Sequence, residues 1–297
     1  MKKVVGLGAN VLDTLINCES YPVEDTKQKS SGIFLAGGGP VGNALVVISK
    51  LGIKAEVIGA LADDSASEYL INDFNKYGVE TEGVTRVKNS SSFTSYIVLS
   101  DDTGSRTCLF DRGTVPDLIE NVNLLPLNDA SILHLDGNYM KSAIYAAKKA
   151  KELGVKVSLD AGGLYQGVEE LLPLVDILIP SAEFAMKFTE KDNIVDAIKI
   201  LQDKYSPEIL VVTNGDKGGC YYEEGKILSY DSVKVKAVDT NGAGDTFHGA
   251  FLVAYLNGKN IKECCEYASI VAGYKCTQKG ARDYHVDDEI IKSFNKK

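Results

Sequence analysis

From residue 130 onward, short runs of apolar residues alternate with longer segments in which apolar residues recur at helical spacing. The short runs predict strands and the longer segments predict helices. The predicted strands are 131–135, 156–160, 175–179 and 209–213, and the predicted helices are 141–153 and 193–205. Because strands that alternate with helices form βαβ units, this pattern predicts a parallel sheet with helices packed against it.

The N-terminal part of the chain has a different pattern, in which strand-like runs dominate. The predicted strands are 3–8, 31–36, 55–60, 92–100 and 106–110, and the predicted helices are 45–51 and 65–77. A turn of the sequence Asp101-Asp102-Thr103-Gly104 separates the last two strands and predicts a hairpin. These runs do not fit a parallel sheet, so they form either a separate small sheet or edge strands of the main one.

Composition narrows the class of protein. The chain of 297 residues is 44% hydrophobic and 25% charged, which is typical of a folded domain. Its net charge of −9 argues against nucleic acid or an anionic membrane as a partner. No apolar run is long enough to span a membrane, and the N-terminus does not resemble a signal peptide. We therefore expect a soluble, cytoplasmic protein.

The six cysteines have no Cys-x-x-Cys spacing, and the chain has only three histidines. A structural zinc site is therefore not expected. Because no signal peptide is evident, we expect buried, reduced thiols rather than disulfides.

The segment Asp239-Thr240-Asn241-Gly242-Ala243-Gly244-Asp245 carries the clearest chemistry, because it runs directly into an apolar, helix-forming segment at 247–256. Amide groups at the start of a helix attract anions, and small residues let a ligand approach the backbone. A carboxylate at Asp245 would repel a phosphate, but it could accept a proton from a hydroxyl that attacks phosphorus. The alternative is an ordinary helix start, with Asp245 as a capping residue.

This segment, continued to Phe247, resembles the C-terminal signature of the ribokinase-like (PfkB) carbohydrate kinases. The stretch Gly38-Gly39-Pro40-Val41-Gly42-Asn43, followed by an apolar run to Leu51-Gly52, resembles the N-terminal signature of the same family. Weaker similarities follow the family order at Asp13, 212–218 and 278–281. The resemblance spans nearly the whole chain.

The resemblance implies a single domain of residues 1–297 with a three-layer α/β/α, Rossmann-like fold, a mainly parallel central sheet and a small β-sheet lid. It places the lid segments at about 11–36 and 92–112. It also implies transfer of the γ-phosphoryl group of ATP to a hydroxyl of a small ribose-like, fructose-like or related sugar, and dimerisation through the lid. We expect closure of such a lid to exclude water.

The resemblance also assigns roles to individual residues. Asp245 would be the general base, and the amides of Gly242, Ala243 and Gly244 would stabilise charge in the transition state. The residues expected to hold the sugar are Asp13, Gly39, Asn43 and Asp136. Those expected on the nucleotide side are Thr213, Asn214, Gly215, Gly218 and Gly280. Two of these residues have alternative roles: Asn43 could cap a helix, and Asp136 could cap a turn. The role of Asp160, at another strand end, is open.

Metal binding is where the sequence departs from the family pattern. Relatives carry Asn-x-x-Glu, but the matching stretch here places Ser181 and Phe184 at those two positions, with Glu183 one residue early. ATP chemistry implies Mg²⁺, and Glu183 is the candidate ligand. Asp239, the carbonyl of Asn241 and the backbone at Lys279-Gly280 fall where some relatives bind a monovalent cation such as K⁺.

Three further functions compete with a sugar kinase. Gly37-x-Gly39-x-x-Gly42, with Asp63-Asp64 about 20 residues later, satisfies the dinucleotide fingerprint and would indicate an NAD-dependent oxidoreductase. Pro40 within that loop argues against it. The second competing function is that of a nucleoside kinase of the same family, and the third is that of a sugar-sensing pseudokinase.

Overall fold

A nine-stranded sheet forms the centre of the molecule. The computed structural model describes residues 2–103 and 105–294. The strand order is β15-β14-β13-β12-β11-β10-β1-β4-β6, and every neighbouring pair is parallel except β13–β14 and β14–β15. The strands are β1 (Lys3–Leu7), β4 (Lys54–Val57), β6 (Val79–Glu80), β10 (Ile132–Leu135), β11 (Lys156–Ala161), β12 (Ile177–Pro180), β13 (Ile209–Thr213), β14 (Gly219–Glu223) and β15 (Lys226–Tyr230).

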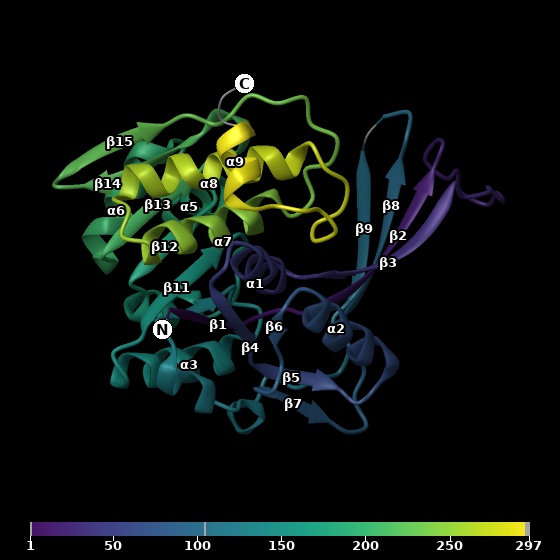
Figure 1. The fold of residues 1–297 in the computed structure, drawn as a ribbon, viewed down its shortest axis with the longest axis horizontal. Helices are drawn as coiled ribbons and strands as arrows, with labels where there is room; N and C mark the ends of the chain where they lie inside the picture. Colours follow the sequence, from purple (N-terminus) through teal and green to yellow (C-terminus); the bar gives the residue numbers. More distant parts are fainter. Residues whose placement is uncertain (1, 104, 295–297) are drawn as a thin grey trace.

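Helices cover both faces of this sheet, as the alternating pattern predicts (Figure 1). Neighbouring strand residues point to opposite faces, so Val4 joins one hydrophobic core and Val5 joins the other. The first core includes residues of α1 (Pro40–Lys50), α2 (Ser65–Lys76), α7 (Ala243–Leu256), α8 (Ile261–Cys276) and α9 (Asp288–Phe294). The second includes residues of α3 (Met140–Glu152), α4 (Val168–Leu171), α5 (Ala182–Thr189) and α6 (Ile194–Tyr205).

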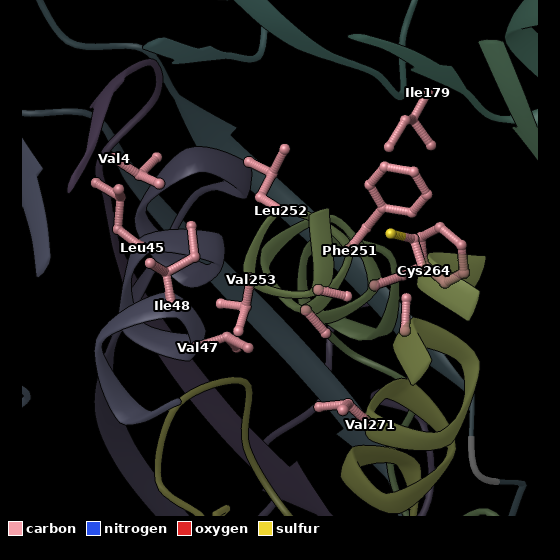
Figure 2. Packing of buried hydrophobic residues seen from close by; sticks show 14 of the residues in the cluster. Val4, Leu45, Val47, Ile48, Ile179, Phe251, Leu252, Val253, Cys264 and Val271 are labelled. Carbon is pink, nitrogen blue, oxygen red and sulfur yellow. The ribbon is translucent and has the colours of Figure 1, made fainter. Parts of the chain in front are cut away.

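Helix α7 lies in the middle of the first core. Its residues from Thr246 to Ala254 are all buried, as expected for a helix that is surrounded by other elements. Figure 2 shows Leu252 and Val253 of α7 close to Leu45 and Ile48 of α1, while Phe251 lies near Ile179 and Cys264. This packing on several sides holds the N-terminus of α7, which carries Asp245, in a fixed position.

A separate four-stranded sheet projects from the body in Figure 1. Its order is β3-β2-β8-β9, with β2 (Val11–Cys18) and β8 (Thr94–Ser100) parallel and the outer pairs antiparallel. The outer strands are β3 (Gly32–Gly38) and β9 (Arg106–Asp111). This is the small sheet expected as a lid, so the alternative of edge strands in the main sheet is wrong. The hairpin of β8 and β9 is confirmed, although Gly104 of its turn lies outside the described residues.

Several boundaries differ from the sequence predictions. The single strand predicted at 55–60 is divided between β4 and β5 (Gly59–Ala62), because Gly59 has a positive φ of 112°. Strand β5 pairs instead with β7 (Val84–Val87) in a small sheet of its own. Helix α1 begins at Pro40, a residue type preorganised for the first helical position, rather than at residue 45. Asn43 is therefore inside the helix, and the prediction that it caps a helix is wrong.

The sequence patterns missed the helices α4, α5, α8 and α9 and the strands β2, β6, β7, β14 and β15. Short 3₁₀ turns occur at Ile119–Asn121, Leu125–Asp129, Leu172–Leu174 and Gly215–Lys217. All six cysteines are free, but only three are buried, and Cys108 on β9 is exposed. The expectation of buried thiols is thus wrong for Cys108. Among the residues described, no helix combines the length and apolar character needed to cross a membrane.

Candidate active site

A chain of side chains links three distant parts of the sequence at the N-terminus of α7. The Nδ2 group of Asn43 on α1 donates to Oδ2 of Asp245 at 2.6 Å, and Nε of Arg282 donates to Oδ1 of Asn43 at 2.7 Å. Helix α7 has Gly242 as its N-cap and Asp245 in its first turn, so the capping role considered for Asp245 is wrong. Asn43 therefore uses its amide to orient the Asp245 carboxylate.

Arg282 is the buried anchor of this chain. Its side chain is 3% exposed, and it also donates to Asp73 at 2.7 Å and to the carbonyl of Gly38 at 2.9 Å. The glycine-rich loop makes room for it: a Cβ atom added to Gly37 or Gly42 would lie 2.2 or 2.3 Å from its guanidinium nitrogens. Two glycines of the dinucleotide fingerprint thus serve to admit an arginine in this fold.

The glycine-rich loop does not occur in the setting that a dinucleotide site requires. The strand before it, β3, belongs to the projecting sheet and pairs antiparallel with β2, whereas the fingerprint needs a strand of the parallel sheet. Asp64, the candidate ribose ligand, caps α2 by accepting from the amide of Ser67. These observations oppose the oxidoreductase alternative.

Asp13 lies in the middle of strand β2, on the projecting sheet, and is almost completely buried. Ser95 on β8 donates to its Oδ1 at 2.5 Å, and a Cβ atom on Gly38 would lie 2.1 Å from its Oδ2. Burial raises the pKa of Asp13, while the Ser95 hydrogen bond and the charge of Arg282 lower it in part.

Asp136 directly follows β10, and Asp160 is the penultimate residue of the adjacent parallel strand β11; both are buried. Both oxygens of Asp136 accept backbone amides, from Ala9 and Asn138 at 2.9 Å each, so its carboxylate fixes the loop after β1. Asp160 lies 3.3 Å from Nε2 of His248, which is one turn beyond Asp245 on α7. Burial raises the pKa of Asp160, but the charge and hydrogen bond of His248 outweigh it and hold the pKa below its ordinary value.

The surroundings of Asp245 make it a stronger base than an ordinary aspartate. Burial of the carboxylate, followed by the negative charge of Asp160, raises its pKa to about 6, although Asn43 and His248 act in the opposite direction. A base with a pKa near the working pH is effective in proton transfer and still largely ionised. Among the predicted site residues, Asp245 is thus the one whose environment fits proton abstraction.

A cavity of about 360 Å³ lies beside the N-terminus of α7. Its lining includes the predicted residues Thr213, Gly215, Gly218, Ala243 and Gly244, together with apolar side chains at Val233, Val235, Phe247 and Ala272. The cavity thus has an apolar part and, at one end, the first amides of a helix, which have no intrahelical partner.

Three of the residues predicted to contact the nucleotide or its phosphates have backbone amides that donate hydrogen bonds within the protein. The amide of Ala243 donates to the carbonyl of Thr240 at 3.2 Å, and that of Asn214 donates to Gly218 at 2.8 Å. The amide of Gly280 donates to Oδ2 of Asp239 at 2.9 Å, and neither Asn214 nor Gly280 lines the cavity. Their contribution is therefore to shape the two loops that border the cavity.

The candidate metal ligands are not gathered in one place. Glu183 is 75% exposed and pairs with Lys187 at 2.6 Å on the surface of α5. Ser181 caps α5, accepting from the amide of Phe184, and the Phe184 ring is buried. In the described part of the chain, no group of three or more His, Cys, Asp or Glu side chains could hold a metal. Mg²⁺ bound to nucleotide phosphates and water does not require such a group.

Asp239 holds the loop before α7 rather than projecting into the cavity. Its carboxylate accepts the amides of Asn241 and Gly280, and its carbonyl accepts a hydrogen bond from the fully buried Lys275 at 2.8 Å. The sequence reasoning missed Lys275, because a lysine on a partly charged helix is usually solvent-exposed.

Two further residues were missed. Arg282 follows the Lys-Gly-Ala turn directly, and that turn was the only sequence signal for it. Asn10 is buried beside the glycine-rich loop, with its Oδ1 lacking a hydrogen-bond partner among the described residues. A buried polar atom without a partner is rare in folded proteins and indicates a site for a ligand or a water molecule.

The fold and this site together define a class. A three-layer α/β/α body, a projecting sheet that carries a buried carboxylate, and a base at a helix N-terminus beside a cavity are the parts of a phosphotransferase that acts on a small alcohol. Comparison with known families agrees: residues 1–288 match the family described as pfkB family carbohydrate kinase. The chain belongs to this family and is a carbohydrate kinase, a phosphotransferase with an alcohol group as acceptor.

Individual relatives span the chain almost completely. A probable fructokinase-5 from Arabidopsis thaliana is 32% identical over 311 residues, covering 94% of this chain and 92% of its own. A ribokinase from Haemophilus influenzae is 26% identical over 291 residues, covering 95% and 94%. Among solved structures, the Arabidopsis thaliana ribokinase complexed with ribose and ATP aligns with a TM-score of 0.86 at 26% identity, covering 99% of this chain and 98% of its own.

Proposed function

We propose that this kinase transfers the γ-phosphoryl group of ATP to a hydroxyl of a small sugar, with Asp245 as the general base. The observation that carries the proposal is the position of Asp245. It lies at the helix N-terminus that borders the cavity, and Asn43 links it to the glycine-rich loop. A base in this position can reach an alcohol held on one side and a phosphoryl group presented from the other.

ATP would occupy the cavity of about 360 Å³, with its base and ribose between the apolar side chains and its phosphates at the start of α7. The amides of Gly242 and Gly244 would stabilise the charge that develops on the transferred group. The Asp245 carboxylate accepts the proton of the attacking hydroxyl. Mg²⁺, when bound to the phosphates, would neutralise part of their charge, held by water and by few protein groups.

The sugar would lie between the projecting sheet and the glycine-rich loop. Asp13 has an ionisable carboxylate there, and the Oδ1 atom of Asn10 has no hydrogen-bond partner in the described part of the chain. Gly39 has a positive φ of 96° and no room for a side chain. Asn43 uses one amide hydrogen on Asp245, which leaves the second for a sugar hydroxyl. For Asp136, whose two oxygens are already occupied, we propose that it positions the sugar-binding loop.

The identity of the sugar is tested with a panel. Relatives are named as a fructokinase, a ribokinase and a ketohexokinase, so ATP consumption should be measured with ribose, fructose, related sugars and nucleosides. We expect turnover with at least one sugar and formation of a sugar phosphate. Turnover with nucleosides alone would favour the nucleoside kinase, and binding of a sugar without ATP consumption would favour the pseudokinase.

The sugar site can be tested with Asp13→Ala. Hydrogen bonds to a charged group are worth about 1.5–3 kcal/mol, so kcat/KM for the best sugar should fall at least about tenfold, while KM for ATP changes little. Asp101→Ala, on an exposed turn of the same sheet, is the matched control and should have no effect. Unchanged sugar kinetics in Asp13→Ala would show that the sugar lies elsewhere.

The nucleotide site can be tested with Gly244→Ala. Apart from its chain neighbours and the backbone of its own helix, a Cβ atom at Gly244 would meet no described atom within 4 Å. Because Gly244 lines the cavity, the methyl group would enter the cavity rather than strain the fold. The melting temperature should stay the same or rise, since alanine is the better helix former, while ATP affinity falls. Calorimetric titration measures this; the wild type should bind ATP with Mg²⁺ and not NAD. Tight NAD binding without ATP binding would contradict the proposed nucleotide site.

We also propose that two copies associate through the projecting sheet. Leu35, Tyr96 and Leu109 lie in one row across the projecting sheet, on the face opposite Asp13. All three side chains are at least half exposed. Apolar clusters of this kind on a sheet mark interaction surfaces. Light scattering should show a dimer for the wild type and a monomer for Leu35→Lys combined with Leu109→Lys. A wild-type monomer at assay concentration would contradict this proposal.

A further inference from the structure

Lys275 occupies an unusual position for a lysine. It lies in the last turn of α8, its side chain is 0% exposed, and its Nζ donates to the backbone carbonyl of Asp239 at 2.8 Å. The same ammonium group lies 3.9 Å from Oδ1 of Asp239. Lysine is almost never fully buried unless it is paired, and here Asp239 supplies the partner.

The contact fastens the loop that leads into α7. The carbonyl of Cys276 accepts the amides of Val238 and Asp239 at 2.7 and 3.1 Å, and the Asp239 carboxylate accepts the amides of Asn241 and Gly280. The loop is thereby tied to the C-terminal end of α8 by several bonds. Lys275 adds a positive charge at Asp239 of this loop.

Asp239 and its neighbouring carbonyls are the oxygen atoms that the resemblance offered to a monovalent cation. An ammonium group resembles K⁺ in charge and size, and here it already binds the Asp239 carbonyl. Two unit charges about 4 Å apart repel by about 4 kcal/mol at the effective dielectric constant of a protein surface. A cation at these oxygens and the Lys275 ammonium therefore exclude each other, so the expected K⁺ does not fit this site.

We propose that Lys275 is a built-in replacement for the monovalent cation, so that this kinase works without K⁺ activation. The proposal rests on the sugar kinase function argued above, and it concerns the regulation of that site. In this arrangement the group that holds the loop before α7 is covalently attached to the chain and does not have to be bound from solution. Arg106 of the projecting sheet, which donates to Oδ1 of Asn241 at 3.0 Å, supplies a second positive charge to the same loop.

The wild type provides the first test. Initial rates with saturating ATP and sugar should be equal in KCl and in tetramethylammonium chloride at the same ionic strength. The melting temperature should likewise be the same in both salts. Saturable activation or stabilisation of the wild type by K⁺ would overturn the proposal, since the ion would then bind beside Lys275.

Lys275→Ala provides the second test, because it removes the charge and opens space for an ion. In tetramethylammonium chloride kcat should fall about tenfold or more, and KCl should restore part of it. KCl should also raise the melting temperature of this variant, because an ion that binds only the folded state stabilises it. Lys262→Ala, an exposed position on the same helix, is the control and should behave like the wild type.

Lys275→Met keeps the length of the side chain without its charge. It should lose activity as Lys275→Ala does, but KCl should not restore it, because the methionine fills the space. Rescue of Lys275→Met by K⁺, or full activity of either variant without K⁺, would contradict the proposal. If Lys275→Ala does not fold, the salt dependence of the wild type and the activity of Lys275→Met still test the proposal. If no sugar is phosphorylated at all, the proposed function fails, and the two melting temperatures of the wild type still test this inference.

Discussion

Asp245→Asn should abolish most of the activity of this kinase while making the protein more stable at neutral pH. Loss of a general base typically lowers the rate by ~10²–10⁴-fold, and ATP affinity should remain because the helix amides are unchanged. The asparagine keeps the shape of the side chain and can still accept the hydrogen bond of Asn43. A variant that retains kcat within about tenfold of the wild type would exclude Asp245 as the base.

The expected gain in stability follows from the raised pKa of Asp245. An unfolded aspartate has a pKa of about 3.9, whereas the folded state raises that of Asp245 to about 6. The folded state thus binds the proton more tightly, and this contribution to stability is complete below about pH 4 and lost as pH rises through about 6. At neutral pH the ionised carboxylate costs on the order of 2 kcal/mol.

Thermal unfolding between pH 4 and pH 8 measures this effect. The melting temperature of Asp245→Asn should exceed that of the wild type above pH 6 by a few degrees, and the difference should shrink toward pH 4. Asp203→Asn, on an exposed position of α6, is the matched control and should show no such pH-dependent difference. A difference that is the same at every pH would show that the carboxylate is not strained by its surroundings.

Arg282→Met should destabilise the protein strongly. The substitution leaves the Asp73 carboxylate, whose side chain is only 10% exposed, without its partner. Breaking one side of a buried ion pair costs about 3–5 kcal/mol. The melting temperature should fall by roughly 5–15 °C. Because Asn43 also loses a hydrogen bond, the orientation of Asp245 and kcat should suffer in whatever folded protein remains.

Two comparisons separate the charge of Arg282 from its size. Arg282→Met combined with Asp73→Leu should recover part of the lost stability, because no unpaired charge is then buried. Arg282→Lys should remain impaired, since an ammonium group cannot reproduce the fixed geometry of three guanidinium bonds. Arg112→Met, on an exposed part of the chain, is the control. Wild-type stability of Arg282→Met would show that the link from Asp73 to Asn43 is not a structural anchor.

Local sequence patterns were sufficient to predict those elements of the fold that depend mainly on residues close together in the chain. The alternation of apolar runs and periodic helices predicted the parallel sheet, and the glycines before Asp245 predicted the helix start at the cavity. The pattern could not show the break between β4 and β5, because that break depends on the positive φ of Gly59 within a continuous apolar run. Helix α5 spans only eight residues, which is too short a segment to establish a helical period from the sequence.

The roles of individual side chains depended on contacts that no local pattern contains. Arg282 and Asn43 are 239 positions apart and are joined by a hydrogen bond. Asn43, a predicted sugar ligand, also donates to Asp245, the proposed base. Lys275 is fully buried on α8, a helix with several charged residues, so the sequence of α8 did not indicate that this lysine is buried. Asp136 was recognised as a strand-end acid, but only the structure shows that both of its oxygens are occupied by amides.

The most direct test of the central claim is the pH dependence of kcat/KM for the sugar at saturating ATP. This ratio reports the pKa of the essential base before the sugar binds. If Asp245 accepts the proton, kcat/KM should fall tenfold per pH unit below a midpoint near pH 6, and the residual activity of Asp245→Asn should lack this acidic limb. A wild-type profile that stays flat well below pH 6, or an unchanged acidic limb in Asp245→Asn, would contradict the account.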